Sequence, residues 1–255
     1  MKSRVATIAR YTLLEALRTR LPAIALVAVG LLFLSSLFVE QIAITGGTRL
    51  RTGFYAAGAR WAAVFIVAFH VLAAVAREFD DKGLEVLLAL DLPRSHYVLG
   101  RLAGFVALGV LLAIVACVPL SWSAAAPALL QWGISLAFEL AIVAALALFC
   151  ILTFNHLMPA AGFVAAFYVL ARVLTAIRLM AASPVAAADT SHHAMRLAVD
   201  GLAWVLPAFD GWTQTAWLVN AQAAWGELGK IAGEGTLYVL LLAAAAMFDL
   251  YRKNF

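Results

Sequence analysis

Long runs of apolar residues, each close to the length that crosses a lipid bilayer, recur along this 255-residue sequence. A transmembrane helix needs about 20 such residues in succession. In the chain 65% of residues are hydrophobic and 13% are charged, with a mean hydropathy of +0.97, whereas soluble domains have roughly 45–50% apolar and about 25% charged residues. The runs do not alternate between apolar and polar residues, which favours helices over a barrel. We therefore exclude a soluble enzyme and a disordered chain, and predict an all-α polytopic membrane protein.

The apolar runs predict six transmembrane helices in a single domain. They lie at about 21–39, 55–76, 102–120, 128–152, 159–180 and 231–250. Residues 1–20 carry five basic residues and gather apolar residues on one helix face, which is typical of an amphipathic helix lying on the membrane surface. An extended first span is the alternative. Between the spans we expect a polar loop at 40–54, a cytoplasmic loop at 77–101 and outer-face loops and short helices at 181–230.

The basic residues predict the orientation. With both termini inside, eleven Lys and Arg residues lie on the inner side and five on the outer side, and Arg172 and Arg178 lie within a span. The positive-inside rule therefore predicts cytoplasmic termini. The net charge of +4 then reflects basic loop ends facing an anionic leaflet rather than nucleic-acid binding.

The stretch 197–219 is apolar enough to suggest a seventh span, but it contains Asp200 and Asp210. Charges at the bilayer centre are costly, so we expect outer-face helices, surface-lying or re-entrant and buried against protein. All seven tryptophans fall on the outer side of the six-span topology, which supports an even number of spans. An aromatic belt in the headgroup region is predicted for the tryptophans of this stretch, Trp204, Trp212 and Trp217. A gate or a contact for a lipidic or periplasmic partner is the alternative for the tryptophans of this stretch.

The most charged stretch of the chain is the predicted cytoplasmic loop at 77–101. It turns at Gly83, continues as a short apolar helix and breaks at Pro93. Such a helix can bury its apolar face against a partner protein while its carboxylates pair with basic residues of that partner. A solvated loop whose helix lies on lipid headgroups is the alternative.

The residue order of this loop resembles that of ABC-2-type transporter permeases. Leu84 stands where threonine is common in that family, and Arg101 stands where lysine is common. The basic N-terminal helix, the six spans and the long last outer loop also match, so the resemblance covers the whole chain in layout and residues 77–101 in motif. The matching positions are Glu78, Gly83, Glu85, Leu87, Leu88, Pro93, Ser95, Tyr97, Gly100 and Arg101.

The resemblance implies the permease subunit of an ATP-driven exporter in a bacterial inner membrane, paired with an identical or related second permease. Two copies of a separate ATP-binding subunit, which bind ATP and Mg²⁺, would dock on a coupling helix at 83–90, and a periplasmic accessory protein is a further candidate partner. The layout is similar to permeases linked to copper-enzyme maturation and to the haem-exporter membrane subunit; lipid, polysaccharide and drug substrates stay open. The implied coupling residues are Glu78, Asp80, Asp81, Gly83, Leu84, Glu85, Leu87 and Leu88.

Two ionisable residues lie inside predicted spans, Glu139 in the fourth and Arg172 in the fifth. They are about equally far from the tight turn at 153–158, so an antiparallel hairpin would hold them at equal depth. Ionisable groups in a span are usually paired or line a cavity. We therefore predict a structural Glu139–Arg172 ion pair, with a role in translocation or no contact as the alternatives.

No catalytic residue, metal site or cofactor is predicted in this chain. The sequence lacks the pattern G-x-x-x-x-G-K-[ST], so ATP hydrolysis is expected on a partner chain. Adjacent His192 and His193 on the outer loop are a weak metal signal. The alternative function is a secondary transporter that uses Glu139 and Arg172, although no inverted repeat of the kind common in that class is evident. A membrane enzyme would need more convergent His, Asp or Ser residues than the sequence offers.

Overall fold

The computed structural model describes residues 2–80, 93–181, 199–202, 205–221 and 225–252, and these residues form helices, turns and short connections without a β-strand. Among the described residues, six helices are long and apolar enough to cross a membrane. The predictions of an all-α fold and of six membrane helices are confirmed. In chain order the elements are α1 (Lys2–Arg18), α2 (Leu21–Ile42), α3 (Gly47–Asp80), α5 (Arg94–Leu120), α6 (Ala126–Phe154), α7 (Leu157–Ala181), η2 (Phe209–Gly211), α9 (Thr215–Asn220) and α10 (Trp225–Arg252).

Each of the six membrane helices contains one predicted span and extends beyond it at one or both ends. The loop predicted at 40–54 is wrong in extent, because helix resumes at Gly47 and only residues 43–46 separate α2 from α3. An ion pair between Arg51 and Glu40 (2.6 Å) closes this hairpin. The loop predicted at 77–101 is also shorter, since α3 continues to Asp80 and α5 begins at Arg94. Polar residues in both places extend the helices beyond the apolar stretch, which hydropathy alone does not detect.

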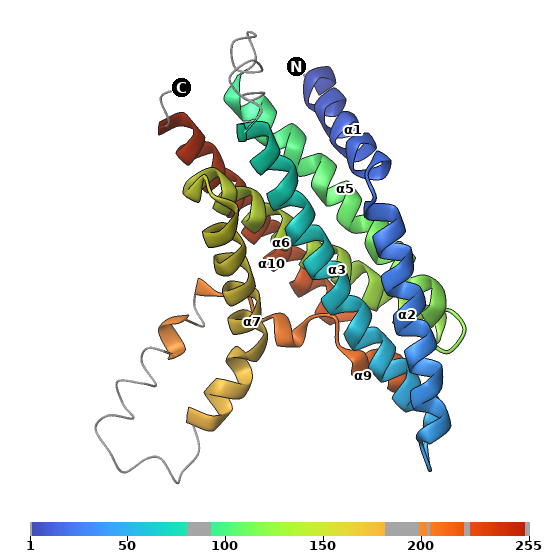
Figure 1. Cartoon of the computed structure of the whole chain (residues 1–255). Coiled ribbons are helices and arrows are strands. Elements are labelled where there is room, and N and C mark those ends of the chain that lie inside the picture. Colours follow the sequence, from blue (N-terminus) through green and yellow to red (C-terminus); the bar gives the residue numbers. More distant parts are fainter. Residues whose placement is uncertain (1, 81–92, 182–198, 203–204, 222–224, 253–255) are drawn as a thin grey trace.

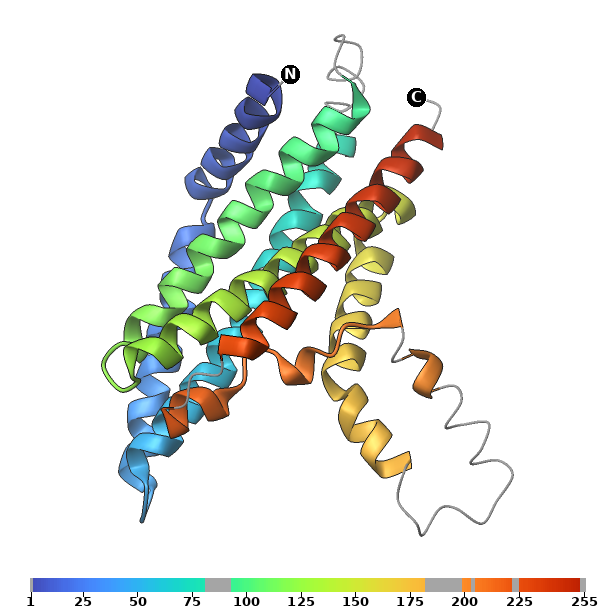
Figure 2. The same ribbon diagram turned by 180° about the vertical axis from the view of Figure 1, so that it is seen from behind.

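The N-terminal helix α1 packs lengthwise along α5 (Figures 1 and 2). It ends before Thr19, whose hydroxyl links the end of α1 to the start of α2. The hydroxyl donates to the Ala16 carbonyl (2.6 Å) and accepts from the Leu21 N–H (3.3 Å). In both views α2 then continues in much the same direction as α1. The structure therefore has a separate N-terminal helix, while its predicted position on the membrane surface stays a prediction.

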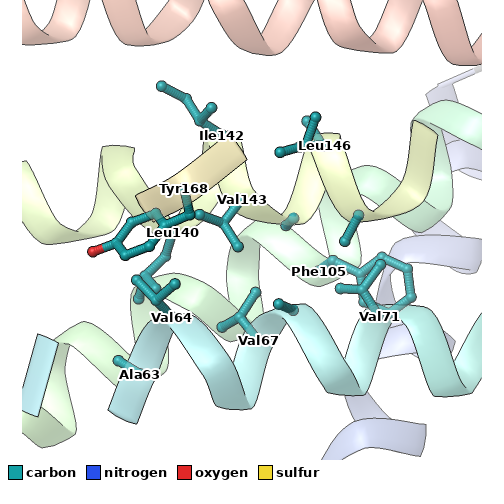
Figure 3. Packing of buried hydrophobic residues seen from close by; sticks show 14 of the residues in the cluster. Ala63, Val64, Val67, Val71, Phe105, Leu140, Ile142, Val143, Leu146 and Tyr168 are labelled. Atoms are coloured by element: carbon teal, nitrogen blue, oxygen red, sulfur yellow. The ribbon is translucent and has the colours of Figure 1, made fainter. Parts of the chain in front are cut away.

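The core surrounds α6. In the most apolar 18-residue stretch of α6, 78% of the residues are buried, whereas in the corresponding stretch of α2 only 11% are buried. Figure 3 shows Val64 and Val67 of α3 facing Leu140 and Val143 of α6, with Tyr168 of α7 beside them. In contrast, α2 leaves most of its apolar surface exposed. Because α2 is apolar and uncovered, it is suited to contact lipid or another membrane helix.

The described part of the outer segment, η2 and α9, folds back across α3, α6 and α7 instead of lying outside the bundle (Figure 2). The predicted aromatic belt is therefore wrong for Trp212 and Trp217, which are buried inside the protein. Trp204 lies outside the described residues. Burying large aromatic surface against protein offers more contact than leaving it at the headgroups.

The first turn of α1 and the last turn of α10 lie at one end of the bundle, together with the end of α3 and the start of α5 (Figure 1). An even number of crossings requires this arrangement. The end where these four helix termini meet, here called the termini end, is the one predicted to face the cytoplasm.

Candidate functional site

Four charged or polar side chains meet at the termini end, between α1, the last turn of α3 and the first turns of α5. Arg101 of α5, 5% exposed, donates to the Glu15 carboxylate of α1 (2.9 Å) and to the Thr12 hydroxyl (3.2 Å). Its second amino group is ion-paired with Glu78 of α3, and the Tyr97 hydroxyl donates to the same carboxylate. We call Glu15, Glu78, Tyr97 and Arg101 the loop-base cluster. One guanidinium thus joins three helices and is paired with two carboxylates, which leaves the cluster with one excess negative charge.

Two glycines of α5 let α1 approach this cluster closely. A Cβ at Gly100 would lie 2.7 Å from the side chain of Ile8 and 3.2 Å from the Val5 carbonyl oxygen. A Cβ at Gly104 would lie 2.8 Å from the Ala9 carbonyl oxygen. Small residues at helix interfaces permit such close backbone packing in membranes. Gly100, singled out only by its place in the loop motif, therefore has a steric reason to be glycine.

The structure brings together three of the motif positions, Glu78, Tyr97 and Arg101, from the two sides of the loop. Of the implied coupling residues, Asp80 ends α3. Apart from Glu78 and Asp80, the implied coupling residues lie outside the described residues: Asp81, Gly83, Leu84, Glu85, Leu87 and Leu88.

A second polar group lies at mid-height in the bundle, around Glu139 of α6, which is fully buried. Its Oε1 accepts from the Tyr168 hydroxyl (2.6 Å) and lies 3.6 Å from Arg172 Nη1. Its Oε2 accepts from the Thr213 hydroxyl (2.5 Å). The two residues predicted as a pair are thus brought together by the antiparallel α6–α7 hairpin, and the contact is an ion pair.

The remaining acceptors around this group come from the backbone of the outer segment. Arg172 donates to the Phe209 carbonyl and to the Trp212 carbonyl (3.1 Å). Arg60 of α3, 7% exposed, donates to the Thr213 carbonyl (3.0 Å). Thr213 is held at φ +50°, a conformation that β-branched residues rarely adopt. In this conformation its N–H also donates to Ser135 (2.9 Å).

We call Arg60, Ser135, Glu139, Tyr168, Arg172 and Thr213 the mid-span cluster. Two guanidinium groups and one carboxylate leave it with one excess positive charge, which the carbonyl oxygens of the outer segment stabilise. Every oxygen of Glu139 is engaged by protein. This arrangement fastens the outer segment to α3, α6 and α7.

Several members of the two clusters were not identified from the sequence. Arg60 is one of the five basic residues that the orientation prediction places on the outer side. This placement is wrong, because α3 is helical from Gly47 and holds Arg60 well inside it, 7% exposed. Its position within a long helix is a signal that could have identified it. Tyr168 and Thr213 carry no such signal, because one is an ordinary aromatic in a span and the other an ordinary turn residue.

Within the described ranges, no three His, Cys, Asp or Glu side chains gather as metal ligands; His192 and His193 lie outside those ranges. In comparisons with known proteins, no family model and no curated protein matches the chain.

Proposed function

We propose that this chain is the permease subunit of an ATP-driven ABC-2-type exporter, with ATP and Mg²⁺ bound by a separate ATP-binding subunit. The observation that carries the proposal is the loop-base cluster. Motif residues from both sides of the 81–92 segment meet there, and Arg101 joins them to the N-terminal helix.

The cluster supports a coupling role for mechanical reasons. A force applied to 81–92 would reach the end of α3 through Glu78 and the start of α5 through Tyr97 and Arg101. Because Glu15 is paired with the same guanidinium, α1 would move with them. Contacts within a connected network of this kind can transmit a displacement without a flexible joint in between.

The first experiment is purification of the tagged chain from its native membrane, followed by mass spectrometry of the intact complex. The proposal expects an ATP-binding subunit at equal stoichiometry, with two permease chains per complex. A homo-oligomer without any ATPase would contradict it and favour the secondary transporter.

The second experiment tests coupling in that complex. Glu85→Lys in the loop and Arg101→Gln in the loop-base cluster are expected to reduce transport-linked stimulation of ATP hydrolysis while the complex still assembles. Arg252→Gln, an exposed arginine at the same end of the bundle, is the matched control and should retain stimulation. If both Glu85→Lys and Arg101→Gln retain full stimulation of ATP hydrolysis, the ATP-binding subunit does not dock on this loop and the assignment is excluded.

The mid-span cluster is the one feature that bears on the secondary transporter. Transport by a buried ion pair needs a carboxylate that can exchange partners with an ion or substrate. Glu139 is instead fully buried and held by Tyr168, Thr213 and Arg172. This geometry favours a structural role, so the exporter subunit is the function that we put forward.

A further inference from the structure

A groove of about 420 Å³ opens between the first turn of α2 and the second half of α3. The part of the groove nearer the termini end is lined by Thr19, Arg20 and Arg77. Further along it is lined by Ile24, Phe65 and Phe69, each more than a third exposed. The groove is therefore basic at one end and, apart from His70, apolar along the rest of its length.

The dimensions of the groove match one membrane leaflet. Arg77 and Phe65 are twelve residues apart on one helix, which corresponds to about 18 Å at 1.5 Å per residue. Half of the hydrocarbon core of a bilayer is about 15 Å thick. With Arg77 at the headgroup level, Phe65 would lie close to the bilayer centre, so a single acyl chain can follow the apolar part.

The basic end of the groove offers an anion more than the side chains of Arg20 and Arg77. Arg20 immediately precedes α2, so the positive dipole end of this helix faces the same region. Arg77 is steadied by a hydrogen bond from its Nε to the Ala73 carbonyl (3.2 Å). A phosphate is the group that such a combination of guanidinium groups and a helix N-terminus binds.

A second groove, of about 290 Å³ between α5 and α6, provides a comparison. It is lined only by apolar residues and glycine, among them Ile114 and Ile134. Such a surface can take an acyl chain but offers nothing to a charged headgroup. Charge complementarity therefore distinguishes the α2–α3 groove from it.

We propose that the α2–α3 groove binds one anionic phospholipid of the surrounding bilayer. Its phosphate lies between Arg20 and Arg77 at the start of α2, and one acyl chain lies along Ile24, Phe65 and Phe69. Basic pockets between transmembrane helices bind anionic headgroups in this way. The proposal does not depend on transport, since a bound lipid would occupy the groove whatever the chain moves.

The test of the headgroup end is native mass spectrometry of the purified chain released from nanodiscs of phosphatidylglycerol mixed with phosphatidylcholine. We expect one retained phosphatidylglycerol, preferred over phosphatidylcholine by about tenfold or more. Arg20→Gln with Arg77→Gln should abolish the preference. Arg10→Gln with Arg252→Gln removes the same charge from exposed positions outside the groove and should keep it. An unchanged preference in the first variant, or an equal loss in both, would overturn the proposal.

The acyl end is tested by filling each groove. Ile24→Trp should remove the retained lipid, whereas Ile114→Trp, a matched change in the α5–α6 groove, should not. Ile24 and Ile114 are 57% and 58% exposed, so neither change strains the core, and unaltered melting temperatures will verify this. If the chain retains no lipid and Ile24→Trp instead converts a dimer to a monomer, the groove is a subunit interface and the lipid assignment is wrong.

Discussion

At the scale of single residues, the mid-span cluster is held together by charges that cannot be removed one at a time without cost. Glu139→Gln would leave Arg60 and Arg172 buried without their carboxylate, which costs about 3–5 kcal/mol for a buried pair. Removing Arg172 as well eliminates one of the two uncompensated charges. We therefore expect Glu139→Gln with Arg172→Gln to be no less stable than Glu139→Gln alone.

Thermal unfolding of the wild type, both single variants and the double variant in one detergent checks this expectation. The coupling energy between Glu139 and Arg172 should be about 1–3 kcal/mol. Strictly additive losses would show that the 3.6 Å contact carries no energetic coupling.

The Thr213 hydroxyl provides a second prediction at this scale. Thr213→Val keeps the side-chain shape but removes the donor to Glu139, so it should destabilise the protein by about 1–3 kcal/mol. Thr236→Val is the control, since that hydroxyl is exposed and bonds only within α10, to the Ala232 carbonyl. Chemical denaturation of both variants should separate them; similar stability would mean that Thr213 is not needed to satisfy the carboxylate.

At the scale of elements, the contact of α1 with α5 depends on the absence of a side chain at Gly104. A Cβ there would lie 2.5 Å from the Thr12 side chain and 2.8 Å from the Ala9 backbone, so α1 must shift. We expect Gly104→Ala to cost about 1–3 kcal/mol by overpacking and to make α1 more sensitive to limited proteolysis. Gly30→Ala in α2 meets no atom within 4 Å and should be neutral or stabilising by up to about 1 kcal/mol. Equal protease resistance in the two variants would contradict this account of the α1–α5 contact.

At the scale of the whole molecule, six crossings put the α2–α3 and α5–α6 connections at the end opposite to the termini end. Ile44 and Trp122 are almost fully exposed in those connections, and His156 is exposed in the α6–α7 turn. In a background with Cys117 and Cys150 replaced by alanine, cysteines at 44 and 122 should react with an impermeant maleimide in intact cells. A cysteine at 156 should react only after the membrane is opened. The reverse pattern would invert the predicted orientation, and equal labelling of all three would contradict six crossings.

Hydropathy along the chain is enough to predict a membrane protein, the number of long helices and the approximate position of each, because a run of about 20 apolar residues is a local property. The sequence also paired Glu139 with Arg172, since a short turn between two helices sets their relative depth. Helix ends were less predictable, as polar residues extend α3 and α10 beyond their apolar runs.

Only the tertiary structure revealed that Arg101 joins α1, α3 and α5, and that Thr213 and the carbonyls of the outer segment complete the mid-span cluster. It also decided that Trp212 and Trp217 are buried rather than interfacial. These contacts join residues 23 to 153 positions apart, or lie on a segment without periodicity. A buried charge must find partners wherever the fold brings them, and which groups meet depends on how the helices pack rather than on any local pattern in the chain.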